Sequence, residues 1–241
     1  MFYLREGSLY TTDPVFQALR KDCLMFPDSP QIARDFAMSG SYEQRLIDWA
    51  VGLIDPDTLF LDIGAHVGTY SLAFATRCAG VHSFECSPKT FNYLCANIAL
   101  RDLNDRITPH RYALGATVGK ATYYEHSPDG GGNSCHGFGR SSATKTVEMR
   151  TLDSFQLDNI GLIKMDVEGF EKNVLEGGLD TLIRNRYPRI LFESWRPERQ
   201  SEGIPAAQLR DELFGFLQSI GYIIHPVNGW DEMFIAEHRA T

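Results

Sequence analysis

The segment 59–71, LFLDIGAHVGTYS, constrains the fold more than any other stretch of the chain. Apolar residues surround Asp62, two glycines follow at Gly64 and Gly68, and a helical pattern begins there. A strand, a tight turn and a helix in this order are typical of a cofactor-binding loop in an α/β domain.

The glycine spacing argues against the most familiar ligand of such a loop. The dinucleotide fingerprint G-x-G-x-x-G brings backbone N–H groups against an anionic pyrophosphate. Here the turn 64–68 reads GAHVG, lacks the middle glycine and is preceded by Asp62. A carboxylate at this place would repel a pyrophosphate, whereas it suits the cationic amino group and sulfonium of S-adenosylmethionine. An oxidoreductase that uses NAD is therefore disfavoured.

A second carboxylate, Glu85, ends the next apolar strand. The carboxyl ends of adjacent parallel strands meet at the sheet edge where ligands bind, so Glu85 is placed to accept both hydroxyl protons of a ribose. NAD-binding folds use the same device, and Glu85 alone does not distinguish the two cofactors. The structural alternative makes Asp62 a turn cap and Glu85 a solvated strand end.

From residue 58 onward, strands and helices alternate as in a single doubly wound α/β sheet. A helix is predicted over 41–55, with Trp49 on its apolar face, and another begins at the Ser87-Pro88 pair. Strands are predicted at 58–64, 80–87, 107–115, 119–126, 146–155, 161–167, 189–195, 222–227 and 231–238. Further helices are predicted at 67–78, 168–178 and 206–221.

Two parts of the chain lack this regularity. Residues 1–41 combine turn signals with short apolar stretches, and we expect an N-terminal extension or lid before a domain that spans 42–241. Residues 127–142 are rich in glycine and serine without periodicity, which favours a mobile loop over the substrate.

Charge and cysteine usage restrict the partners and the compartment. The formal net charge of −8 disfavours a general affinity for nucleic acid or an anionic membrane. The five cysteines are scattered and form no C-x-x-C pair, so they indicate neither a disulfide framework nor a zinc site. The first residues carry charges where a signal peptide is apolar, and no run reaches membrane-spanning length. We expect a soluble, cytoplasmic protein.

Acidic residues also gather where two later strands end. Methyl transfer is an in-line displacement that depends on alignment, and an alcohol acceptor also needs a base or a metal ion. Asp166 and Glu168 follow one strand, with Lys164 just before them, and Glu193 ends the next strand. These carboxylates could act as a base with its orienting partner or bind a magnesium-like divalent metal. The structural alternative makes Glu168 a helix cap and Lys164 an ion pair at the strand edge.

The order of five segments resembles the class I S-adenosylmethionine-dependent methyltransferases, and more narrowly the FkbM-type family. They lie between Tyr42 and Trp195 and read DIGAHVGTYS, SFECSPKTFNYLCANIAL, TLDSF, IKMDVEGFEKNVLEGG and PRILFES. The resemblance implies a Rossmann-like, mostly parallel seven-stranded sheet whose last strand is antiparallel. It also implies cofactor contacts from Asp62, Gly64, Ala65, His66 and Gly68, with Glu85 on the ribose. Further candidate cofactor contacts are Glu43, Cys86 and Ala113.

Members of that family usually methylate a hydroxyl oxygen of a sugar, polyketide or other small metabolite. The main hypothesis is therefore O-methylation of a small-molecule or glycan acceptor. Methylation of RNA or of a protein side chain on the same fold is an alternative, and the acidic balance disfavours RNA. A degenerate fold that serves as a non-catalytic interaction module is another.

Overall fold

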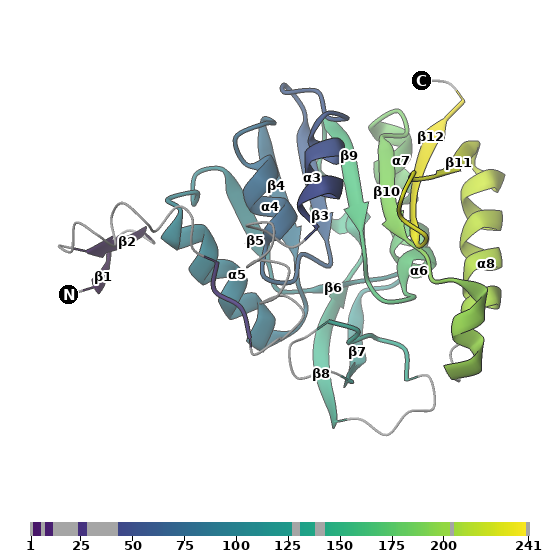
Figure 1. Cartoon of the computed structure of the whole chain (residues 1–241), viewed down its shortest axis with the longest axis horizontal. Coiled ribbons are helices and arrows are strands. Elements are labelled where there is room, and N and C mark those ends of the chain that lie inside the picture. Colours follow the sequence, from purple (N-terminus) through teal and green to yellow (C-terminus); the bar gives the residue numbers. More distant parts are fainter. Residues whose placement is uncertain are drawn as a thin grey trace.

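The computed structural model describes residues 2–5, 8–11, 24–27, 43–126, 131–137, 143–202 and 205–239. A seven-stranded sheet in the order β11-β12-β10-β9-β3-β4-β5 forms its centre (Figure 1). Its strands are β3 (Leu59–Ile63), β4 (Gly80–Phe84), β5 (Ile107–His110), β9 (Ile160–Met165), β10 (Arg189–Glu193), β11 (Tyr222–Pro226) and β12 (Met233–His238). β12 pairs antiparallel with both β10 and β11, and all other neighbouring strands of this sheet pair in parallel. The predicted doubly wound α/β fold is confirmed.

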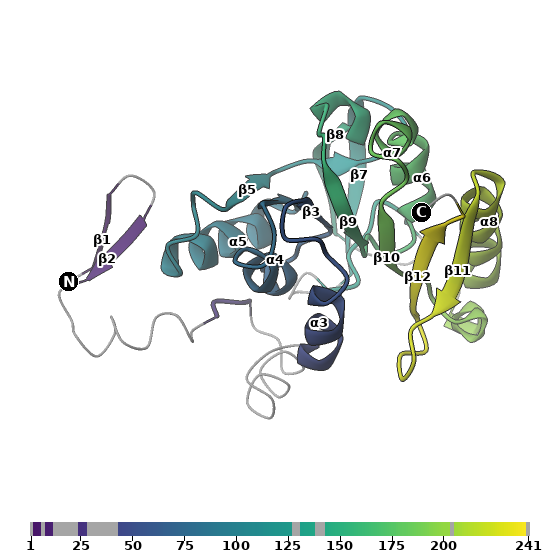
Figure 2. The same ribbon diagram turned by 90° about the horizontal axis from the view of Figure 1, so that it is seen from above.

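Helices cover both faces of the sheet (Figure 2). One face carries α3 (Gln44–Val51), α4 (Thr69–Phe74) and α5 (Pro88–Leu100), and the other carries α6 (Glu171–Glu176), α7 (Leu179–Arg184) and α8 (Ala206–Ser219). Neighbouring strand residues point to opposite faces, so Phe60 and Leu162 enter the first core while Leu61 and Ile163 enter the second. A sheet buried on both faces explains why its central strands read as continuous apolar runs.

The chain leaves this sheet earlier than the sequence predicted. The strand expected over 107–115 splits after His110, and β6 (Ala113–Leu114) joins a second sheet of order β6-β8-β7. That sheet contains β7 (Gly119–Glu125) and β8 (Ala143–Arg150), which pair antiparallel. The strand expected over 146–155 ends at Arg150, and Leu152–Phe155 form a short 3-10 helix, η2. Apolar residues resume soon after each break, at Tyr112 and at Leu152, so periodicity alone did not reveal the breaks.

The first helix of the domain also differs from its prediction. Trp49, expected on the buried side, is 41% exposed, whereas Leu46, Ile47 and Ala50 are buried. At 100° per residue, Trp49 lies about 100° from the centre of that buried face. The start of α5 follows the prediction, because the Ser87 side chain accepts a hydrogen bond from the Thr90 N–H.

Of the predicted extension, β1 (Phe2–Arg5) and β2 (Ser8–Thr11) form an antiparallel hairpin. Asn97, fully buried on α5, binds the backbone of Met25 through both amide atoms and also donates to the carbonyl of Val67. Residues 24–27 are therefore tied to the turn after β3. The described residues leave out most of 1–41 and, in the glycine-rich loop, 127–130 and 138–142. The domain boundary at 41/42 and the predicted lid therefore remain predictions. None of the helices described has the length and apolar character needed to cross a membrane.

A pair of histidines joins β4 to β5 at the sheet edge. His82 Nδ1 lies 2.9 Å from His110 Nε2, and the His110 ring stacks on Phe84. Burial, and then the neighbouring His82, lower the pKa of His110 to about 4, and burial lowers the pKa of His82 as well. Both rings are therefore neutral at pH 7.

We predict that this pair makes the fold acid-sensitive. An unfolded histidine has a pKa of about 6.5, so stability is fully present above pH 6.5 and is lost as the pH falls towards 4. Urea unfolding at pH 7 and pH 5 measures the loss, compared between the wild type and His110→Phe. The wild type should lose about 1 kcal/mol more than the variant, a figure reduced for the solvent exposure of the ring. Equal losses would contradict the assignment.

Candidate active site

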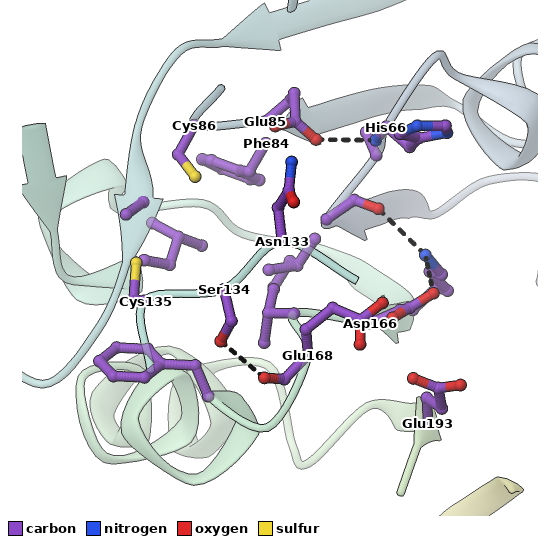
Figure 3. A pocket seen from close by; sticks show the side chains of 18 of the residues that line it. His66, Phe84, Glu85, Cys86, Asn133, Ser134, Cys135, Asp166, Glu168 and Glu193 are labelled. Atoms are coloured by element: carbon purple, nitrogen blue, oxygen red, sulfur yellow. Dashed lines mark hydrogen bonds and ion pairs between the residues drawn. The ribbon is translucent and has the colours of Figure 1, made fainter. Parts of the chain in front are cut away.

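A cavity lies at the carboxyl edge of the sheet, where β3, β4, β9 and β10 end (Figure 3). Parallel α/β sheets bind their ligands at this edge. The segment 131–137 and residues of β6 and β7 complete the wall. The structure brings together most of the predicted site residues on this wall, namely Glu43, Gly64, Ala65, His66, Glu85, Cys86, Ala113, Lys164, Asp166, Glu168 and Glu193.

The turn after β3 is held by its neighbours on both sides. The N–H groups of Gly64 and Ala65 both donate to the carbonyl of Phe84, at 3.0 and 2.9 Å. Gly64 has φ +77°, and a Cβ atom there would lie 1.8 Å from the Asp166 carbonyl oxygen. His66 takes the left-handed conformation at φ 52°, at the place where a dinucleotide loop has its middle glycine. The turn therefore presses against the end of β9.

Glu85 is held by backbone donors on both carboxylate oxygens. The His66 N–H donates to Oε2 at 3.0 Å, and the Ser87 N–H donates to Oε1 at 2.8 Å. Burial raises the pKa of Glu85 to about 7, although these two hydrogen bonds favour the ionised form. Each oxygen keeps a further lone pair, so the carboxylate can also accept from two hydroxyl groups.

Asp62 and Gly68, both predicted to contact the cofactor, lie behind the cavity and do not line it. Asp62 is fully buried, and its Oδ2 accepts hydrogen bonds from the backbone N–H and the hydroxyl of Ser71. Gly68 begins α4 with φ +95°, and a Cβ atom there would lie 2.7 Å from Leu94 Cδ1. Both residues shape the turn from its far side.

Lys164 connects that buried carboxylate with the cavity. Its Nζ donates to the Gly64 carbonyl at 3.1 Å and lies 3.8 Å from Asp62 Oδ1 and 3.5 Å from Asp166 Oδ2. Burial alone would lower the pKa of Lys164, but the carboxylates of Asp166 and Asp62 reverse the shift and raise it. Burial also raises the pKa of Asp62, against the opposing charge of Lys164. This contact is the ion pair that one of the sequence interpretations assigned to Lys164.

Three carboxyl groups meet on the side of the cavity away from Glu85. One oxygen each of Asp166, Glu168 and Glu193 lies within 4.8 Å of the others. Burial and then the charge of Asp166 raise the pKa of Glu168 to about 8. Burial, Asp166 and Glu168 together raise the pKa of Glu193 well above its usual range. Such a group holds a proton near neutral pH or binds a cation.

Glu168 is directed to this group by its backbone and its neighbours. It has φ 56°, its Oε1 accepts from the Gly132 N–H at 2.9 Å, and its carbonyl accepts from the Ser134 hydroxyl. The helix cap that one interpretation assigned to Glu168 is not formed, because α6 begins after Phe170 without a side-chain cap hydrogen bond. Glu171 Oε1 instead accepts from the N–H groups of Val167 and Gly169, in the turn before the helix.

Sequence reasoning also missed Tyr70. Its hydroxyl donates to Glu43 Oε2 at 2.8 Å, and its ring lies beneath Lys164 Nζ. Glu43 itself begins α3 with φ 55°. In the sequence, Tyr70 reads as an ordinary helix residue, and no pattern marks it. Other cavity residues not predicted include Phe84, Tyr112, Leu114, Tyr123, Asn133, Ser134, Cys135 and Phe170.

Known proteins resemble this chain in sequence and in fold. The family described as Methyltransferase FkbM domain matches residues 62–224. The hexuronic acid methyltransferase AglP of Haloferax volcanii is 29% identical over 150 residues, which cover 58% of each chain. This chain thus spans little more than half of that relative.

Two solved structures share the fold. The methyltransferase FkbM of Methylobacillus flagellatus superposes with a TM-score of 0.54 at 16% identity, over 93% of this chain and 58% of that one. An O-methyltransferase of Bacillus cereus, solved in complex with SAH, superposes with a TM-score of 0.51 at 15% identity, over 92% and 95% of the two chains.

The approach of Gly64 to β9 yields a test by substitution. We predict that Gly64→Ala destabilises the protein by about 3 kcal/mol or more, because it combines backbone strain with a clash. Gly229→Ala is the matched control, since Gly229 has φ +85° but open space around its Cβ position. It should cost only about 1 kcal/mol. Urea unfolding measures both, and equal losses would show that the Asp166 carbonyl does not restrict the turn.

Proposed function

Because the chain belongs to the methyltransferase FkbM domain family, we propose that it transfers the methyl group of S-adenosylmethionine to a hydroxyl oxygen of a sugar or other small metabolite. The observation that carries this proposal is the division of one cavity into two sides. Glu85 and the turn after β3 form one side, and three clustered carboxyl groups form the other. The AglP relative is a hexuronic acid methyltransferase, which supports a sugar-type acceptor.

The first side fits the nucleoside part of S-adenosylmethionine. Glu85 has both carboxylate oxygens oriented by backbone N–H groups, and it accepts the two ribose hydroxyls in this proposal. Phe84, Ala113 and Leu114 provide an apolar wall for the adenine, and Cys86 lies beside them. The backbone of residues 64–66 borders the same space.

The amino-acid part of S-adenosylmethionine fits the charges between the two sides. Lys164 offers a buried ammonium group for its carboxylate, while Glu43 offers an oxygen for its amino group. Asp62, which does not line the cavity, forms an ion pair with Lys164. We therefore assign Asp62 the role of positioning Lys164, in place of a direct contact with the cofactor. Gly68 also acts indirectly, because its lack of a side chain lets the turn after β3 pack against Leu94.

The second side fits an alcohol that loses its proton. As the bond from the acceptor oxygen to the methyl carbon forms, the bond from carbon to sulfur breaks and the hydroxyl proton passes to a carboxylate. The ionised form of Glu168 suits this role, because a pKa of about 8 makes that carboxylate a stronger base than an ordinary one. Asp166 and Glu193 adjoin it and complete the acceptor site.

A divalent cation is a second way to use the same group. The three carboxyl groups fit one, because hard oxygen ligands are those that Mg²⁺ and Mn²⁺ prefer. Such an ion would supply a Lewis acid for the acceptor oxygen. Asp166, Glu168 and Glu193 would hold it.

Methylation of RNA has less support than a small acceptor. Glu43, Glu85 and the three clustered carboxyl groups line the cavity, and Lys164 is the one lysine or arginine among the described residues that line it. A phosphate backbone would meet electrostatic repulsion there. The net charge of −8 acts in the same direction.

The ribose contact is tested by calorimetric titration with S-adenosylhomocysteine. Glu85→Gln should weaken binding about tenfold or more, since an amide group cannot accept from both backbone N–H groups and both hydroxyls. Glu176→Gln, an exposed position on α6, is the control and should bind as the wild type does. Parallel titration with NADH should show no binding, and tight NADH binding would overturn the proposal.

The same titration has a predicted pH dependence. Glu85 loses its charge as the pH falls through about 7, and a protonated carboxyl accepts fewer hydrogen bonds. If only the ionised form binds well, the apparent dissociation constant rises about tenfold from pH 8 to pH 6. Glu85→Gln should flatten this dependence, and a flat wild-type profile would exclude Glu85 from the contact.

The acceptor side is tested by turnover over a panel of neutral sugars, sugar acids and small alcohols, followed by release of S-adenosylhomocysteine. Asp166→Asn should reduce turnover about a hundredfold or more and change S-adenosylhomocysteine affinity less than threefold. Full turnover of this variant would remove Asp166 from the mechanism. Manganese titration followed by electron paramagnetic resonance then distinguishes a bound cation from a carboxylate base. A manganese site that is present in the wild type and lost in Glu193→Gln would assign a cation to the three carboxyl groups. Absence of a manganese site in the wild type would assign the carboxylate base.

A further inference from the structure

Two cysteines face each other in the wall of the cavity (Figure 3). Cys86 directly follows Glu85 at the end of β4, and Cys135 belongs to the segment 131–137. Both thiols are free, and both pack on the small apolar cluster formed by Ala113, Tyr123 and Val147. Residues that are distant in the sequence are thus brought together beside the proposed cofactor site.

The two thiols share this cavity wall and this apolar cluster, and each affects the ionisation of the other. Contact with Cys135, followed by burial, raises the pKa of Cys86, whereas contact with Cys86 lowers the pKa of Cys135. A thiol that ionises more readily beside a second thiol is the arrangement found where one cysteine is oxidised and the other resolves it. In this pair, Cys135 is the better nucleophile and Cys86 the resolving partner.

The segment that carries Cys135 also reaches the opposite side of the cavity. Gly132 donates its N–H to Glu168 Oε1, and the Ser134 hydroxyl donates to the Glu168 carbonyl. Ser134 and Tyr124 exchange two backbone hydrogen bonds, which fix the segment to β7. A displacement of Cys135 would therefore move the segment that borders both the proposed ribose contact and the three carboxyl groups.

We propose that Cys86 and Cys135 form a disulfide when a hydroperoxide oxidises them, and that this cross-link closes the cavity to S-adenosylmethionine. The closure rests on the proposed cofactor site. The disulfide itself does not depend on that site.

The chemistry balances with one hydroperoxide for each disulfide. The Cys135 thiolate attacks the terminal oxygen of hydrogen peroxide, the O–O bond breaks, and a sulfenic acid and water result after protonation. The Cys86 sulfur then attacks the sulfenic sulfur, the S–O bond breaks, and the hydroxyl leaves as water with the Cys86 proton. The two thiols are oxidised by two electrons, and the peroxide is reduced to two water molecules.

The geometry explains why the bond would narrow the cavity. A disulfide holds its sulfurs about 2.05 Å apart, closer than any non-bonded contact. Since both sulfurs lie in the cavity wall, the bond draws the segment 131–137 towards the end of β4, over the space beside Glu85. The other described cysteines, Cys78 and Cys95, do not line the cavity.

The test compares the reduced full chain with the same protein treated with hydrogen peroxide. Tandem mass spectrometry identifies the linked peptides, and calorimetry measures the affinity for S-adenosylhomocysteine. We expect a Cys86–Cys135 cross-link, an affinity at least tenfold lower after oxidation, and full recovery with dithiothreitol. No cross-link, unchanged affinity, or a loss that dithiothreitol does not reverse would overturn the proposal.

Two single-cysteine variants make the result specific. Cys135→Ser should keep the same affinity before and after peroxide, whatever that affinity is. Cys95→Ser, which keeps both cavity cysteines, should respond to peroxide as the wild type does. A response that persists in Cys135→Ser would assign the effect to another residue and contradict the proposal. If the reduced wild type binds no S-adenosylhomocysteine, the proposed function and the closure both fail, and the peptide map still decides the disulfide.

Discussion

The close contact between the turn after β3 and the end of β9 is the constraint on which the rest of the site depends. Gly64 leaves no room for a side chain against the Asp166 carbonyl, and the N–H groups of Gly64 and Ala65 bind the Phe84 carbonyl on the other side. Three strand ends are therefore fixed relative to one another. Because Glu85 and Asp166 follow two of these strands, their separation across the cavity is set by backbone contacts.

Buried charged side chains also determine the properties of the site. Asp62, Lys164 and Asp166 form a series in which each charge has a neighbour of opposite sign, although desolvation opposes all buried charges. Beyond Asp166 the balance ends, because Glu168 and Glu193 add carboxyl groups without a matching cation on the described cavity wall. Burial first, and then the charge of the neighbouring carboxylates, raise the pKa values of both groups. Perturbed carboxyl groups in a cavity are a physical reason to look for chemistry there.

Sequence reasoning located cavity residues best where they lie at or directly after the end of a strand. Glu85, Asp166 and Glu193 were found in this way, and all three lie on the cavity wall. It failed where a contact depends on a partner distant in the chain. Tyr70 reads as a helix residue until its hydroxyl meets Glu43. The sequence likewise did not reveal the contacts of Asp62 with Ser71 and Lys164.

The amino-acid sequence by itself determined the order of strands and helices, the class of the sheet and the strand ends that carry acidic residues. These features arise from local pattern, because apolar periodicity and turn chemistry act over a few residues. Only the tertiary structure decided which residues line the cavity, where the chain leaves the main sheet after His110, and that Cys86 and Cys135 pack on the same apolar cluster. Such contacts depend on packing between segments distant in the chain, and no local pattern encodes that packing.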